Sequence, residues 1–292
     1  MAFRKIILCF VLISVFLSSC KKAKEADTPQ HGTITLVADS TFANVTGALT
    51  ERYMALYPEA KIIVKYKKEN EGFLDLLDDK AQVAVMSKTL SSDEKEAYKQ
   101  KVDMKLEPAN FALDGAVFVV PKDSELDSLS VEEIRNKLVN GHQDFIFDSS
   151  NGANFSLVTQ KLKLNRDQIS YGTIKGGDVK IIEELSKYPG KIGVVSYNTL
   201  SREHFPLTQK LKEMVKVLKI SQNNGKAYEP NLVTMRYFEY PFSRVLYFIT
   251  NEGFFGVGNG LIRFSCTQLG QIVVAHDGLQ PYNIYKREVQ MR

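Results

Sequence analysis

The sequence predicts an α/β fold with largely parallel sheets. The first observation is a regular alternation of apolar, β-branched runs with helical patterns, beginning at 33–38. The second is the small and polar character of the segments that follow several of these runs, as at 39–44. Ligands of such sheets bind beyond the carboxyl ends of the strands. We therefore expect a binding site where these loops meet.

Strands are expected where apolar and β-branched residues are bounded by turn residues. These runs lie at 33–38, 61–65, 83–86, 116–120, 145–147, 191–196, 215–220 and 244–250. Apolar residues at helical spacing predict helices between them. The helices are expected near 45–56, 73–77, 134–138, 179–185 and 259–275. Ser130 and Glu133 form a capping-box pattern, and Asp178 is predicted to cap the helix after it.

The amino terminus predicts export and lipid attachment. Arg4 and Lys5 precede a short apolar run and small residues, so 1–19 is interpreted as a signal peptide. The run is too short to span a bilayer comfortably as a helix. The alternative to a signal peptide is a buried N-terminal helix. Its end, LSSC, resembles a bacterial lipobox, which implies lipid on Cys20 and a polar tether at 20–31. We expect a bacterial cell-envelope protein, lipid-anchored on the periplasmic or another extracytoplasmic side.

Composition argues against several classes of function. The formal net charge is +4, and the lysines form no concentrated basic face, so nucleic-acid binding is not expected. Cys9 leaves with the signal and Cys20 takes lipid, so Cys266 has no disulfide partner and is interpreted as a small core residue. The four histidines stand at no metal-ligand spacing. We expect neither a metal nor a cofactor.

No catalytic motif is found, and the chain is not expected to be an enzyme. The glycines of 253–260 have G-x-G-x-G spacing, which is not the dinucleotide fingerprint, and this stretch is interpreted as a flexible loop. A hydrolase G-x-S-x-G motif is missing from the sequence. An enzyme is the weakest alternative, since it requires Ser87, Asp148 and a histidine to meet in space.

Three loops have the character of an anion site. They lie at 39–44, 68–72 and 148–154, each between a predicted strand and a predicted helix. The first N–H groups of a helix have no intrahelical partner and carry partial positive charge. Several helix starts that meet in one cleft would therefore bind an oxyanion.

Six segments, in this order, resemble the phosphate-type substrate-binding proteins of ABC transporters, from about Thr33 to Tyr282. They are ITLVADSTFANV, ENEGFLDLLDDKAQVAVMSKTLSSDE, ALDGAVFVVPKDS with LSVEEIRNKLVNG, GKIGVVSYNTL, YPFSRVLYFIT and FSCTQLGQIVVAHDGLQPY. The resemblance implies a two-lobed class II periplasmic-binding-protein fold with two hinge crossover strands. The crossings are placed near 113–116 and 234–240. Lobe one is then 32–113 plus 238–292, and lobe two is 114–237.

The resemblance also implies a set of site residues, with Lys88 as a cationic partner of the anion. Glu69 stands where the family has a serine, and would repel an anion if it pointed inward. Phe147 falls near the family's arginine, so a bidentate grip on the anion is missing from that loop. The candidate ligand-binding residues are Ser40, Thr41, Phe42, Asn70, Gly72, Ser87, Lys88, Asn151, Gly152 and Ala153.

The function implied is capture of phosphate or a related small oxyanion between the lobes and its presentation to an ABC permease. Such a protein performs no chemistry and acts by hinge closure. Its expected partners are the anion, the permease and, through Cys20, the membrane, and the chain is expected to be a monomer. The alternative is a lipid-anchored interaction or sensing module that has kept the fold and lost anion binding. Glu69 and the missing arginine motivate that alternative.

Overall fold

The computed structural model describes residues 27–223 and 225–285. The predicted signal peptide, Cys20 and most of the predicted tether lie outside these residues. Within the described ranges, none of the helices combines the length and the hydropathy that a membrane span needs.

Two lobes share one path of paired strands, in the order β2-β1-β3-β12-β4-β8-β6-β7. The strands of this path are β1 (Gly32–Ala38), β2 (Ala60–Tyr66), β3 (Val83–Met86), β4 (Ala109–Pro121), β6 (Phe145–Phe147), β7 (Gly172–Thr173), β8 (Ile192–Ser196) and β12 (Ser243–Thr250). β9 (Val215–Val217) and β13 (Gln280–Pro281) also pair with β4. A small second sheet contains β5 (Ser128–Ser130), β10 (Lys219–Ser221) and β11 (Ala227–Tyr228).

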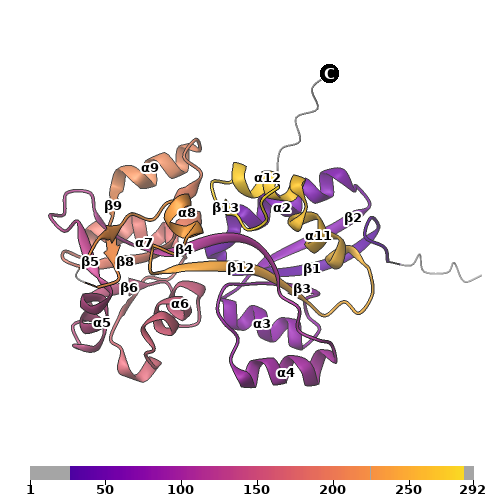
Figure 1. Cartoon of the computed structure of the whole chain (residues 1–292), viewed down its shortest axis with the longest axis horizontal. Helices are drawn as coiled ribbons and strands as arrows, with labels where there is room; N and C mark the ends of the chain where they lie inside the picture. Colours follow the sequence, from indigo (N-terminus) through magenta and orange to yellow (C-terminus); the bar gives the residue numbers. More distant parts are fainter. Residues whose placement is uncertain (1–26, 224, 286–292) are drawn as a thin grey trace, which may run out of the picture.

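Strand β4 joins the lobes because it changes partners along its length. Up to Gly115 it pairs antiparallel with β12, and from Ala116 it pairs with β8. In Figure 1, β4 and β12 run side by side across the middle of the molecule, with one lobe at each end. The predicted two-lobed α/β fold is therefore confirmed. Sequence reading predicted only 116–120 of β4, because Asn110 and Asp114 interrupt the apolar pattern before Ala116.

The second crossing was expected near 234–240, where the structure has a helix and a turn. Asn231 caps helix α10 (Leu232–Arg236), and its side chain accepts hydrogen bonds from two backbone N–H groups of the first turn. Phe238, with a φ of 55°, lies in the turn that follows, and pairing with β4 resumes at Ser243.

Helices cover both faces of each lobe. In the lobe that contains β1, helices α2, α11 and α12 lie on one face and α3 and α4 on the other (Figure 1). The helices are α2 (Ala43–Leu56), α3 (Glu69–Leu77), α4 (Ser92–Val102), α5 (Val131–Val139), α6 (Ala153–Leu162), α7 (Asp178–Glu184), α8 (Tyr197–Ser201), α9 (Pro206–Met214), α11 (Val257–Cys266) and α12 (Gln268–His276). Three 3-10 turns are η1 (Ser40–Phe42), η2 (Arg166–Gln168) and η3 (Leu185–Lys187). The predicted capping box of Ser130 and Glu133 is present at α5.

Alternation along β1 explains why helices are needed on both faces. Leu36 packs into the core under α2 and α11, whereas its neighbour Val37 packs into a separate core under α3 and α4. Successive side chains of a strand point to opposite faces, so an apolar strand such as β1 must be covered twice. The other lobe has its own core around Phe118 and Phe145.

Several local expectations were wrong. The single helix expected at 259–275 is two helices, because Thr267 caps α12 with its hydroxyl and ends α11. Gly258 and Gly260 belong to α11 and pack against Glu252 and Tyr53 rather than forming a flexible loop. The expected strand 215–220 is divided into β9 and β10. By contrast, Cys266, at the end of α11, is partly buried and packs against the core under α2 and α11, in agreement with its interpretation as a core residue, and burial raises the pKa of its thiol.

Candidate functional site at the lobe interface

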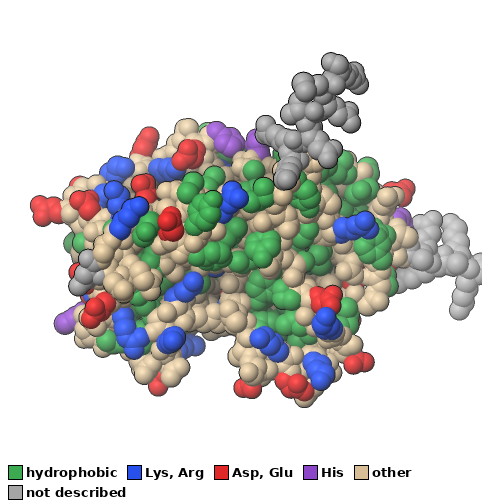
Figure 2. Space-filling view, viewed as in Figure 1, with side chains coloured by type: hydrophobic (Ala, Val, Ile, Leu, Met, Phe, Trp, Pro, Cys, Tyr) green, Lys and Arg blue, Asp and Glu red, His purple; other side chains and the backbone are tan. Residues whose placement is uncertain are grey.

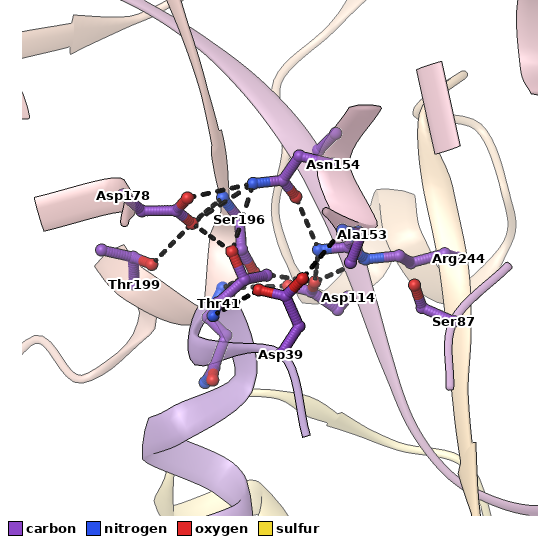
Figure 3. Close-up of polar contacts among 12 residues, drawn as sticks. Asp39, Thr41, Ser87, Asp114, Ala153, Asn154, Asp178, Ser196, Thr199 and Arg244 are labelled. Atoms are coloured by element: carbon purple, nitrogen blue, oxygen red, sulfur yellow. Dashed lines mark hydrogen bonds and ion pairs between the residues drawn. The ribbon is translucent and has the colours of Figure 1, made fainter. Parts of the chain in front are cut away.

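The three loops singled out in the sequence meet at the lobe interface, around the carboxylate of Asp39. This carboxylate is 1% exposed and accepts hydrogen bonds from the backbone N–H groups of Thr41, Glu69 and Ala153, at 3.1, 3.1 and 3.0 Å. Each donor lies at or next to the start of a helix: η1, α3 and α6. Figure 3 shows Asp39 directed between Thr41 and Ala153. We call these three N–H groups the cradle.

The geometry of the cradle follows from the order of strands and helices. β1, β2 and β6 end at Ala38, Tyr66 and Phe147, and the chain enters a helix soon after each. β6 runs antiparallel to β1 and β2, so the helix starts present unpaired N–H groups and partial positive charge from the two sides of the lobe interface. Donors of this kind bind oxyanions, and here they are occupied by the carboxylate of Asp39.

Asp178 is the second buried carboxylate at this interface, and it was predicted as a helix cap. It is instead the first residue of α7, and its side chain accepts hydrogen bonds from Thr41 Oγ1 (3.0 Å), Asn154 Nδ2 (3.1 Å), Ser196 N (2.6 Å) and Thr199 Oγ1 (3.0 Å) (Figure 3). Burial raises the pKa of Asp178 to about 7, and the nearby charge of Asp148 adds to the shift.

Glu69 is buried, and its side chain points inward towards the end of β3. Its Oε1 accepts hydrogen bonds from Ser87 Oγ (2.8 Å) and Lys88 N (3.2 Å), while Oε2 has no hydrogen-bond partner among the described residues. Burial raises the pKa of Glu69. Lys88, expected to face the anion, instead directs its ammonium to Asn70 and Glu94.

A guanidinium does reach the interface, from a strand rather than from the opening loop of α6. Arg244 Nε and Nη2 donate to Asp114 Oδ2 at 2.8 and 2.6 Å, and Nη2 also donates to Asn154 Oδ1 at 2.9 Å. Its Cζ lies 4.6 Å from the centre of the Phe42 ring. Both charged side chains are fully buried, and Arg244 Nη1 is without a partner among the described residues.

Two further ion pairs between described residues join the lobes, and one of them is between Arg202 and Asp277. In the other, Lys68, which precedes α3, pairs with Asp148, which follows β6. Burial raises the pKa of Asp148, and the charge of Lys68 opposes that rise. The interface therefore combines several buried carboxylates with few cations, and most of these charges already have protein partners.

The structure places four of the ten predicted site residues in the buried part of this interface. Thr41, Phe42, Gly152 and Ala153 are buried there, and Gly152 is packed so closely against Asp148 that a Cβ would lie 3.0 Å from Oδ1. The remaining residues differ in position: Ser40 is exposed, Asn70 and Asn151 are half-buried, Ser87 and Lys88 are buried at the end of β3, and Gly72 packs inside α3 against Val37.

Sequence reading missed Asp39, Asp114 and Arg244 as site residues. Asp114 and Arg244 are charged residues inside otherwise apolar strand patterns, and a charge at such a position is buried only when it is paired. That signal was available in the sequence. Asp39 lay inside the loop at 39–44, and an aspartate before a helix is expected to cap that helix. Its further hydrogen bonds with the N–H groups of Glu69 and Ala153 were therefore not predicted.

Two α/β lobes joined by crossing strands around a polar, N–H-rich interface define a hinged ligand-binding protein. A family model described as the PBP superfamily domain matches residues 23–266. This match covers most of the chain, which therefore belongs to the PBP superfamily.

Relatives with known names are similar over most of the chain. The chain is 25% identical to the phosphate-binding protein PstS of Staphylococcus haemolyticus over 231 residues, 73% of this chain and 69% of that protein. It is 23% identical to PstS of Pseudomonas aeruginosa, with 94% and 93% covered. The fold matches that of a phosphate ABC transporter substrate-binding protein of Clostridium perfringens, which was solved with bound phosphate. The TM-score is 0.70 and the sequence identity 15%, and the match covers 86% of this chain and 100% of that chain.

Proposed function

We propose that this chain is the substrate-binding protein of an ABC importer, and that it captures phosphate or a related small oxyanion between its lobes. The observation that carries the proposal is the cradle: N–H groups of Thr41, Glu69 and Ala153 converge on one carboxylate. A carboxylate and a phosphate present the same kind of oxygen acceptor, so donors arranged for one can serve the other.

The names of the relatives support the same assignment. The two curated relatives are phosphate-binding proteins, and the structural match was solved with phosphate bound. These names favour transport over the alternative of a sensing module that has lost its ligand. They also support a binding protein rather than an enzyme, and a permease as its partner.

Ligand capture on this proposal requires the lobes to separate, because the cradle is buried and filled. Asp39 Oδ2 joins the lobes through Ala153 N, and Lys68 joins them through Asp148. When the lobes open, Ala153 N moves away from Asp39 Oδ2, and an external oxyanion can then compete with the carboxylate of Asp39 for the N–H groups of the cradle. Closure around the anion then stabilises the bound state.

The position of the protein in the cell belongs to the same proposal. Lipid on Cys20 would hold the lobes beside a membrane that contains the permease, and two or more acyl chains give stable anchoring. We propose an extracytoplasmic monomer. Mass spectrometry of the chain purified from a bacterial membrane, with Cys20→Ser as the control, should show the added lipid only on the unmodified sequence.

Anion binding is tested by isothermal titration calorimetry with phosphate, sulfate and molybdate. We expect saturable binding of at least one anion and a rise in melting temperature that increases with its concentration. Because Asp39 competes for the cradle, the same titrations are made with Asp39→Ala. Absence of binding by all three anions to both proteins would overturn the proposed function.

A further inference from the structure

A large cavity next to the cradle is not explained by capture of a four-oxygen anion. It has a volume of about 730 Å³ and is lined by both lobes, from the end of β3 to the end of α6. Figure 2 shows the molecule hollowed between its lobes in the lower half of the view. Pockets for organic ligands measure about 300–1,000 Å³, so this cavity has room for an organic molecule.

The charge of the cavity has one sign. Lys88, Lys95, Lys161 and Arg244 line it, and its lining contains no acidic residue. Among the described residues, neither Lys95 nor Lys161 forms an ion pair, and desolvation lowers the pKa of Lys161. Their positive charges are therefore available to a ligand, whereas Lys88 pairs with Glu94 and Arg244 pairs with Asp114.

A buried hydrogen-bond donor lies in the same wall. Arg244 is 2% exposed, and its Nη1 lacks a partner among the residues that the structure describes. An unsatisfied buried donor costs about 1–3 kcal/mol, more when it is charged, so such groups are rare without a ligand or water. Nη1 is itself covered in this arrangement, so an oxygen of an anion in the cavity would satisfy it only after the residues that cover it move.

The cavity lining also has an apolar part, which includes one strained aromatic residue. Leu106, Pro108, Leu157 and Val245 line the cavity together with Phe238. Phe238 has a φ of 55°, which is unfavourable for a bulky residue, and its side chain is 50% exposed. Strained residues concentrate at ligand-binding positions, where the surrounding structure holds them.

We propose that this cavity is a binding site for an organic oxyanion, whose anionic group contacts Arg244 and Lys161 and whose apolar part packs against Phe238 and Leu157. The inference rests on the proposed function, because the cavity opens beside the same lobe interface. It extends the substrate class from inorganic anions to organic phosphates, phosphonates or carboxylates. Gln160 and Thr89 exchange two hydrogen bonds across the cavity rim, at 3.1 and 2.9 Å, so closure of the lobes would enclose such a ligand.

The test compares phenylphosphonate with inorganic phosphate by calorimetry. We expect Phe238→Ala and Lys161→Gln each to weaken phenylphosphonate binding by about threefold or more. Inorganic phosphate, which lacks the apolar part, should bind Phe238→Ala as it binds the unmodified protein. The matched controls are Phe254→Ala and Lys163→Gln, an exposed phenylalanine and an exposed lysine outside the cavity lining.

Two results would overturn this inference alone. One is binding of inorganic phosphate without binding of phenylphosphonate. The other is phenylphosphonate binding that neither Phe238→Ala nor Lys161→Gln changes, with the fold of both variants verified by circular dichroism. Failure of phenylphosphonate, phosphate, sulfate and molybdate to bind either the unmodified protein or Asp39→Ala would instead remove the proposed function, and this inference with it.

Discussion

The carboxylate of Asp39 accepts a hydrogen bond from the backbone N–H of Ala153 at 3.0 Å, across the lobe interface. These residues are 114 positions apart in the sequence. Asp39 follows β1 in one lobe, and Ala153 begins α6 in the other. The closed arrangement is therefore stabilised by an anion that belongs to the protein itself, at the place where the proposed ligand would bind.

Asp39→Ala should empty the cradle. Three buried N–H groups lose their acceptor, so we expect the free energy of unfolding without ligand to fall by about 2 kcal/mol or more. Phosphate affinity should rise, because the anion no longer competes with the carboxylate. Chemical denaturation followed by circular dichroism, which suits a chain without tryptophan, and calorimetry measure the two effects. Asp167→Ala, at an exposed aspartate, should change neither.

Arg244→Met should be strongly destabilising because it leaves the carboxylate of Asp114 buried without its cation. Removal of one partner of a buried ion pair costs about 3–5 kcal/mol. The double substitution Asp114→Asn with Arg244→Met should recover part of this loss, since no net charge remains buried. Urea denaturation of the four proteins of the cycle measures the coupling, and equal stability of all four would contradict it. Lys105→Met removes an ion pair with Glu107 in which the two side chains are 84% and 72% exposed. It should lower the free energy of unfolding by less than about 1 kcal/mol.

The pKa of Asp178 makes stability depend on pH near neutrality. Since this pKa is raised to about 7, the folded protein holds a proton between about pH 4 and 7 that the unfolded chain has released. The free energy of unfolding should therefore fall as pH rises through this window, by up to about 1.4 kcal/mol per pH unit from this group. Above the raised pKa the contribution is constant.

Asp178→Asn should reduce that pH dependence. We expect the difference in unfolding free energy between pH 5.5 and pH 7.5 to be smaller in the variant than in the unmodified protein. Glu69 and Asp148, whose pKa values are also raised by burial, keep their contribution in both proteins. An identical pH difference in the two proteins would show that Asp178 is ionised throughout this range.

Lys68→Met should favour separation of the lobes. It removes the cation from Asp148, whose side chain is 3% exposed, and water can reach this carboxylate only if the interface opens. Small-angle X-ray scattering should show a larger radius of gyration without ligand, and saturating phosphate should reduce the difference. Lys80→Met breaks an exposed pair with Asp78 and should leave the scattering unchanged.

The sequence by itself determined the α/β class, the positions of most strands along the chain and the three loops that meet at the interface. Periodicity and turn residues are local, and the carboxyl ends of the parallel strands β1 and β2 lie at one edge, so the loops at 39–44 and 68–72 could be predicted to converge. The loop at 148–154 follows a strand of the other lobe, and it reaches them because the two lobes pack against each other. The capping box at Ser130 could be predicted because its pattern is also local. The break at Thr267 between α11 and α12 was missed, because a hydroxyl cap inside an apolar pattern is a weak signal.

Only the tertiary structure decided how the charges are paired. Arg244 and Asp114 lie 130 positions apart, and β4 and β12 must pair in register before the two side chains meet. Asp39 could have faced solvent as an ordinary cap, and its contact with Ala153 depends on closure of the lobes. Sequence patterns report which residues are apolar and where a chain turns. The partner of a buried charge depends on packing between distant segments, because only desolvation at that contact makes pairing necessary.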